Sequence, residues 1–273
     1  MTMRIGTEPP DLQLTLMDSG QCFRWTRNGE RYGCVLNGAP VWLYSDADEL
    51  YAEGDADIEY LRRYLDLERD YSAIAAEYAH IPSARTAIER YPGLRVLNQP
   101  TWEVLICFIL SANNNVTRIR NLTDALCRRY GEEYDGLYAF PTPERLAAAD
   151  EAELRALKVG YRAPFIIETA RRVCEGFPLE KLCDMPYAQA LDLLTTLPGV
   201  GDKVANCVLL FGCGHASAFP VDVWVERVMR EWFDMTCPSR AALCRQSREL
   251  LGPHAGIMQQ FLFHAARMEK LGT

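Results

Sequence analysis

The sequence predicts an α+β fold in which an N-terminal antiparallel β-sheet domain precedes two all-α helical subdomains that carry a helix-hairpin-helix motif. Short apolar runs broken by Asn-Gly turns fill residues 12–51, and apolar residues recur at helical spacing from about Asp55 onward. Two glycines separate two such helices at 199–201. We expect a β domain over 1–66, a central helical domain over 67–185 and a hairpin region with the C-terminal helices over 186–273.

The first part is expected to form antiparallel strands. Its β-like runs are the alternating Leu12, Leu14 and Leu16, then Cys22-Phe23-Arg24-Trp25, Tyr32-Gly33-Cys34-Val35-Leu36 and Val41-Trp42-Leu43-Tyr44. Asn28-Gly29 and Asn37-Gly38 lie between runs and are typical of hairpin turns. Ser19-Gly20-Gln21 is expected to be a loop beside the sheet.

The remaining chain is expected to be helical. The apolar spacing predicts helices near 58–65, 71–78, 102–110, 116–126, 141–149, 151–157, 163–175, 186–196, 203–211, 223–232, 239–251 and 257–271. The segment 102–110 is apolar almost all round, which places it in the centre of the helical part. Asp222 is expected to cap the helix that follows it.

Leu197-Pro-Gly-Val-Gly-Asp-Lys203 forms the turn between two helices. Pro198 ends the first helix, Gly199 and Gly201 tolerate positive φ, and the opening amides of the second helix have no intrahelical partner. Such amides, at the positive end of a helix dipole, suit a phosphate. By itself the stretch is equally consistent with an ordinary helical hairpin.

Charge and cysteine content limit the function classes. With 37 acidic and 29 basic residues the net charge is −8, which argues against non-specific nucleic-acid binding by long-range attraction but not against a local basic face. Cys237 and Cys244 have the spacing that opens an iron–sulfur motif, but Ser247 occupies the next ligand position, so no cluster is expected. No membrane span or secretory signal is visible, which predicts a cytoplasmic protein.

Lys203 and Cys207 are four residues apart and share a helix face. Burial and the helix dipole favour a neutral, nucleophilic amine at Lys203, whereas a nearby Asp222 would favour the ammonium, so the sequence leaves the balance open. The alternative is a solvated lysine and an aspartate that only caps. For the asparagines at 113–115 and for Tyr161-Arg162, turn formation and surface packing are likewise alternatives to nucleic-acid contact.

Five colinear motifs resemble the 8-oxoguanine DNA glycosylase family. They are Ser19-Gly-Gln-Cys-Phe-Arg-Trp25, Ser111-Ala-Asn-Asn-Asn115, Gly160-Tyr-Arg162, Leu197–Lys203 with Pro220-Val-Asp222, and Gly252-Pro-His-Ala-Gly256. The hairpin, with an aspartate 19 residues after the lysine, is similar to that of the helix-hairpin-helix glycosylases. The resemblance covers nearly the whole chain and implies a bifunctional 8-oxoguanine glycosylase and AP lyase of prokaryotic form.

The resemblance also implies residue roles. Lys203 matches the nucleophile that attacks C1′ and forms the Schiff base whose β-elimination nicks the strand, and Asp222 matches the aspartate that stabilises the developing positive charge. For the substrate, the resemblance implies that the Gly20 carbonyl accepts N7–H of 8-oxoguanine, that Cys207 and Phe263 sandwich the base, and that Gln259 reads its Watson–Crick edge.

For the DNA, it implies that Asn113 fills the gap left in the helix by the flipped base and that Tyr161 is the wedge. Arg118 and Arg162 match the arginines that read the orphaned cytosine, and Gly199 and Gly201 match the glycines that hold phosphate.

Two positions depart from the eukaryotic pattern. Trp224 replaces a histidine that faces a phosphate, and Ala266 replaces an acidic residue near the base. The implied partner is double-stranded DNA containing 8-oxoguanine. The protein is expected to be a monomer that binds no membrane and requires no cofactor. Whether a monovalent cation binds at the hairpin stays an open question. One alternative is an alkylpurine glycosylase of the same superfamily, which Lys203 disfavours because that class uses the aspartate without a lysine nucleophile. The other is a non-catalytic helix-hairpin-helix DNA-binding protein.

Overall fold

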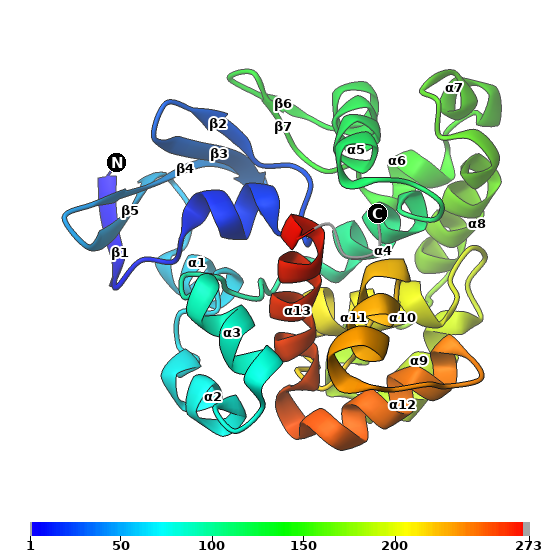
Figure 1. Ribbon diagram of the computed structural model, residues 1–273. Helices are drawn as coiled ribbons and strands as arrows, with labels where there is room; N and C mark the ends of the chain where they lie inside the picture. Colours follow the sequence, from blue (N-terminus) through cyan, green and yellow to red (C-terminus); the bar gives the residue numbers. More distant parts are fainter. Residues whose placement is uncertain (1, 270–273) are drawn as a thin grey trace.

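The computed structural model describes residues 2–269, in which an antiparallel sheet is followed by a helical body (Figure 1). The five-stranded sheet has the order β1-β5-β4-β3-β2. Its strands are β1 (Thr2–Thr7), β2 (Thr26–Asn28), β3 (Arg31–Leu36), β4 (Ala39–Asp46) and β5 (Glu49–Gly54). A separate hairpin pairs β6 (Glu133–Tyr134) with β7 (Leu137–Tyr138). The predicted fold class is confirmed.

The hairpin turn between β3 and β4 lies where the sequence predicts it. Leu36 pairs with Ala39, and both residues between them, Asn37 and Gly38, have positive φ, at 48° and 74°. Two central residues with positive φ define the type I′ turn, whose twist matches that of paired strands.

The prediction of strands at 12–16 and 22–25 is wrong. Residues Gln13–Asp18 form a short π-type helix, η1, whose start is capped by Asp11 Oδ1 accepting from the Leu14 amide at 2.8 Å. The leucines alternate because the helix lies between two cores: Leu12 and Leu16 pack under the sheet, whereas Leu14 packs into the helical body. Residues 22–25 are an irregular segment.

Strand β1 was not predicted, because Thr2–Thr7 is a largely exposed edge strand whose polar composition carries little periodic signal.

The predicted helices appear in the predicted order, but α3 was not predicted, because Pro82 suggests a break and here begins the helix. They are α1 (Ile58–Tyr64), α2 (Tyr71–Tyr78), α3 (Pro82–Arg90), α4 (Thr101–Leu110), α5 (Val116–Tyr130), α6 (Pro143–Ala147), α7 (Glu151–Ala156), α8 (Ala163–Cys174), α9 (Tyr187–Thr195), α10 (Asp202–Cys213), α11 (Val223–Phe233), α12 (Arg240–Leu251) and α13 (Ala255–Glu269). Short 3₁₀ helices are η2 (Gly160–Arg162), η3 (Leu179–Asp184) and η4 (Gly252–His254). The end predicted for the last helix, at 271, lies outside the described residues.

Helices α4 and α10 form the centre of the helical body. Every residue of α4 except Trp102 is buried, which agrees with its apolar sequence, and Phe108 stacks on Phe211 of α10 with 5.5 Å between ring centroids. One core cluster includes residues from both sides of position 185, whereas the sheet has a separate core. The predicted division of the helical part therefore stays a prediction.

Helix α13 crosses the molecule between α3 on one side and α11 and α12 on the other (Figure 1). Gly256, in its first turn, donates its amide to the Ala216 carbonyl at 2.8 Å. A Cβ at this position would lie 2.2 Å from the Ala218 carbonyl oxygen and 2.7 Å from Leu210 Cδ1. The glycine therefore permits the close approach of α13 to the segment 216–218, which follows α10, and side chains of α10 and α13 line one cavity.

Gly256→Ala is expected to lower the free energy of unfolding by about 3 kcal/mol, because the added methyl group meets fixed backbone atoms and the helix must move. Urea denaturation followed by circular dichroism measures the effect. Gly201→Ala is the control, since a Cβ there has no neighbour within 4 Å and φ is −103°. Equal midpoints for Gly256→Ala and wild type would show that α13 can shift without loss.

Candidate active site

The hairpin between α9 and α10 has the backbone geometry expected of an anion-binding turn. Gly199 has φ of 79°, and a Cβ there would lie 2.7 Å from the Phe165 ring. Gly201 is the N-cap of α10 and provides no side-chain acceptor for the first amides of the helix. Both glycines are exposed, so these amides lie at the surface at the positive end of the α10 dipole.

A cavity of about 800 Å³ opens beside this hairpin. We call it the Lys203 cavity. The predicted site residues that line it are Gly20, Asn113, Gly199, Gly201, Lys203, Cys207, Asp222, Gln259 and Phe263. They come from the η1 loop, the α4–α5 loop, the hairpin, α10, the cap of α11 and α13. The tertiary structure thus brings together residues up to 243 positions apart, from Gly20 to Phe263.

Lys203 lies in the first turn of α10, with its amine held from α4. The Nζ atom donates to Ser111 Oγ at 2.8 Å and lies 4.7 Å from the centroid of the Phe108 ring. Ser111 in turn donates to the Phe108 carbonyl at 2.7 Å. Among residues 2–269 no ion pair within 4 Å involves Lys203, so the amine is oriented by a neutral hydroxyl and an aromatic face.

Asp222 is the N-cap of α11, as its position in the sequence predicts. Its Oδ1 atom accepts from the amides of Trp224 and Val225, at 2.9 Å each. The second oxygen makes no hydrogen bond with another described residue. The cap bonds fix the carboxylate at the wall of the cavity, and the α11 dipole favours its negative charge.

Cys207, Gln259 and Phe263 form the inner part of the cavity. Burial raises the pKa of the Cys207 thiol to about 11, so the side chain is neutral and presents an apolar surface. Gln259 and Phe263 are one turn apart on α13 and therefore share a face. The Oε1 atom of Gln259 is buried without a hydrogen-bond partner in the described chain, and an unpaired buried acceptor in a cavity suits a bound donor.

The remaining predicted DNA contacts lie in and around the α4–α5 loop. Asn113 has positive φ, at 51°, and donates from Nδ2 to the hydroxyl of Tyr161 at 3.3 Å. Tyr161 is 47% exposed. The Arg118 side chain is exposed and makes no hydrogen bond or ion pair with another described residue.

Arg162 differs from Arg118. It is buried, its guanidinium donates to the carbonyls of Ala112 and Val159, and it lies 4.4 Å from the Tyr161 ring. Its Nε atom is buried without a hydrogen-bond partner in the described chain. Its predicted contact with a DNA base stays a prediction.

Several residues that sequence reasoning missed also line the cavity, among them Phe108, Ser111, Gln260 and Arg267. Ser111 has no local signal for its bond to a lysine 92 residues away. Arg267 could have been found, because it follows Phe263 by four residues and so lies on the same face of α13. Trp224 also lines the cavity, whereas Ala266 is fully buried in the core.

No group of three or more His, Cys, Asp or Glu side chains in residues 2–269 is arranged to hold a metal ion. Cys237 instead donates to Gln246 Oε1 at 3.1 Å, and the ten cysteines carry free thiols. Within the same residues, no helix combines the length and apolar character needed to cross a membrane.

Comparison with known proteins places this arrangement. Residues 106–253 match the family model of the HhH-GPD superfamily of base excision DNA repair proteins. Residues 2–105 match the N-terminal domain of 8-oxoguanine DNA glycosylase. The chain therefore belongs to the HhH-GPD superfamily and, within it, to the 8-oxoguanine DNA glycosylase family.

Individual relatives agree with this assignment. The N-glycosylase/DNA lyase of Saccharomyces cerevisiae is 32% identical over 81% of this chain and 68% of its own length. The probable N-glycosylase/DNA lyase of Methanothermobacter thermautotrophicus is 33% identical over 66% of this chain and 65% of its own length. This chain thus spans about two thirds of each.

A solved structure matches almost completely. The 8-oxoguanine glycosylase/lyase of Clostridium acetobutylicum, in complex with double-stranded DNA containing cytosine opposite 8-oxoguanine, is 29% identical with a TM-score of 0.91. The match covers 99% of this chain and 98% of that one.

Proposed function

We propose that this protein is a bifunctional DNA repair glycosylase that excises 8-oxoguanine from duplex DNA and then nicks the strand by β-elimination. The observation that carries the proposal is the Lys203 cavity, where an oriented amine, a capped carboxylate and a buried unpaired Gln259 oxygen meet. The two relatives with glycosylase/lyase names and the neighbour bound to 8-oxoguanine DNA support the same activity.

In the proposed reaction, the neutral amine of Lys203 attacks C1′ of the flipped nucleotide. The C1′–N9 bond breaks, its electron pair leaves with the base, and the Lys203–C1′ bond forms. Positive charge develops on the sugar in this step, and the nearby Asp222 carboxylate stabilises it. The nitrogen lone pair then forms the C1′=N bond of the Schiff base as the C1′–O4′ bond of the sugar ring breaks, and O4′ takes up a proton. Loss of a C2′ proton then moves electrons towards C3′, the C3′–O bond breaks, and the 3′ phosphate leaves with that electron pair, which cuts the strand.

The proposed base contacts follow from the cavity walls. Cys207 and Phe263 sandwich the flipped base, and the Gln259 amide reads its Watson–Crick edge. The Gly20 carbonyl accepts N7–H of 8-oxoguanine, whereas N7 of guanine carries a lone pair that repels it. A buried hydrogen bond lost in this way costs about 1–3 kcal/mol, which favours the oxidised base.

Reductive trapping tests the proposed function. Borohydride is added to the wild-type protein with a duplex containing 8-oxoguanine opposite cytosine, and a covalent protein–DNA adduct is expected because the reductant fixes the Schiff base. An alkylpurine glycosylase or a non-catalytic DNA-binding protein would form no adduct, and absence of the adduct would refute the proposal.

Arg118→Ala is expected to loosen the preference for cytosine opposite the lesion, because the free Arg118 guanidinium is available to the orphaned base. Excision rates with each of the four opposite bases measure the effect, and the cytosine-to-adenine ratio is expected to fall about tenfold, within the range for one bidentate contact. Arg128→Ala is a control from the exposed side of the same helix. An unchanged ratio would remove Arg118 from opposite-base recognition.

Further parts of the proposal concern assembly and the hairpin. The protein acts as a monomer on cytoplasmic, nucleoid-bound DNA, and a monovalent cation bound by hairpin carbonyls assists phosphate contact at Gly199 and Gly201. Asn113 fills the gap left by the flipped nucleotide, with Tyr161 as the wedge beside it. We also propose that the domain boundaries lie after residues 66 and 185.

A further inference from the structure

The loop that carries Gly20 has an unusual pattern of carbonyl hydrogen bonds. Every carbonyl from Leu14 to Gln21 accepts a hydrogen bond except that of Gly20, which makes none with another residue of the described chain. The donors from outside the loop are Arg120 to Met17 O at 2.6 Å, Arg267 to Asp18 O at 2.9 Å, Gln260 to Ser19 O at 2.9 Å, and Gln99 to Gln21 O at 2.9 Å.

The carbonyls on either side of the free Gly20 carbonyl, those of Ser19 and Gln21, both accept hydrogen bonds. Because each peptide unit is planar, fixing the Ser19 and Gln21 carbonyls orients the peptide planes on either side of the Gly20–Gln21 unit, which contains the Gly20 carbonyl. Gly20 has φ of 73°, and glycine is the residue with the greatest freedom to leave such a conformation. The hydrogen bonds from these donors therefore restrain a backbone conformation that glycine alone would leave free.

Two of these donors belong to the helix that also provides the base contacts. Gln260 and Arg267 lie on α13 with Gln259 and Phe263, and Arg267 lies 5.3 Å from the centroid of the Phe263 ring. A Cβ at Gly20 would lie 3.3 Å from Arg267 Nη1 and 3.5 Å from Phe263 Cε1. One rigid element thus fixes the Gly20 loop and the stacking ring against each other.

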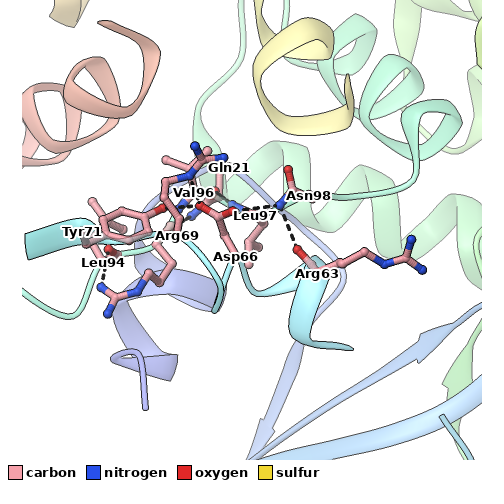
Figure 2. A network of polar contacts seen from close by, with 10 residues as sticks. Gln21, Arg63, Asp66, Arg69, Tyr71, Leu94, Val96, Leu97 and Asn98 are labelled. Carbon is pink, nitrogen blue, oxygen red and sulfur yellow. Dashed lines mark hydrogen bonds and ion pairs between the residues drawn. The ribbon is translucent and has the colours of Figure 1, made fainter. Parts of the chain in front are cut away.

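The other side of the loop is held by the segment before α4. The Gln21 side chain donates to the Arg95 carbonyl and accepts from the Leu97 amide, at 2.8 Å each. Figure 2 shows how this segment is itself fixed: the Tyr71 hydroxyl accepts from the Val96 amide and donates to Asp66. Asp66, only 7% exposed, also accepts from Arg69 and Asn98.

We propose that Arg267 and Gln260 are positioning residues for lesion recognition, which hold the Gly20 carbonyl toward the base with Gln21 and Gln99 on the opposite side. The inference rests on the proposed function, because it gives the free carbonyl its ligand, the N7–H group of 8-oxoguanine. It predicts that loss of a donor impairs recognition of the oxidised base while the lysine chemistry stays intact.

The test compares two reactions of one protein: single-turnover release of 8-oxoguanine, and cleavage at a preformed abasic site in the same duplex. The second needs Lys203 but no base contact. Arg267→Met keeps the side-chain stem and removes the donor, and it is expected to slow base release about tenfold with abasic cleavage unchanged, the effect of one hydrogen bond. Arg267→Lys retains a donor and is expected to recover most of the rate.

Two further variants test whether the effect is specific to the donors that hold the Gly20 loop. Gln260→Leu removes the second α13 donor and is expected to have the same selective effect. Arg145→Met is the matched control, because Arg145 also donates to a backbone carbonyl, that of Tyr130 at 2.9 Å, but does not line the cavity.

The outcomes separate the inference from the proposed function. Equal losses in both reactions, or no loss in either, would refute the positioning role while the proposed function stands. Wild-type protein that releases no 8-oxoguanine would refute the proposed function and this inference with it. A selective loss of base release, restored by Arg267→Lys, would establish the role.

Discussion

Lys203→Gln is expected to abolish borohydride trapping and strand cleavage, because glutamine has no amine to form the Schiff base. Its amide can still accept from or donate to Ser111 Oγ, the partner of Nζ at 2.8 Å, so the cavity is expected to keep its shape. Denaturing electrophoresis of the trapped complex measures the adduct. We expect a loss of at least about 10³-fold in base release, comparable to removal of a nucleophile from an enzyme.

Lys181→Gln is the matched control, since Lys181 is an exposed lysine on η3 that does not line the cavity. It is expected to trap as wild type does. If Lys203→Gln still formed an adduct, a different amine would be the nucleophile and the assignment of the catalytic lysine would be wrong.

Asp222→Asn is expected to bind lesion DNA with wild-type affinity but to excise the base about 100-fold more slowly. The asparagine oxygen can accept the same two cap bonds from Trp224 and Val225, so α11 is expected to begin as before. What is lost is the negative charge that stabilises the developing positive sugar. Gel-shift titration measures binding, and single-turnover kinetics measure excision.

Asp150→Asn controls for the capping role alone. Asp150 caps α7 by accepting from the Glu153 amide at 3.0 Å, and it does not line the cavity. Its replacement is expected to leave excision unchanged. Undiminished excision by Asp222→Asn would make Asp222 a cap and nothing more.

The resemblance implies a histidine in the eukaryotic members at the position of Trp224. Trp224 lines the wall beside Asp222, and the Arg227 guanidinium lies 5.2 Å from its ring. An indole donates one hydrogen bond and carries no charge, so Trp224 cannot supply a positive contact at this wall.

The sequence alone was sufficient for the fold class, for most of the helices apart from α3, for the Asn37-Gly38 turn and for the Asp222 cap. These features depend on local spacing, on glycine conformations and on side chains that bond amides two or three residues away. It failed at Leu12–Leu16, where alternation arises from a helix between two cores and not from a strand.

The tertiary structure decided the remaining features, because they depend on residues far apart in the chain. The Ser111–Lys203 bond spans 92 positions, the unpaired oxygen of Gln259 depends on burial, and Arg162 is held by a carbonyl 50 positions away. The free carbonyl of Gly20 is the clearest case: its neighbours are bonded from 78 to 249 positions away, so no local pattern could show that it alone is left open.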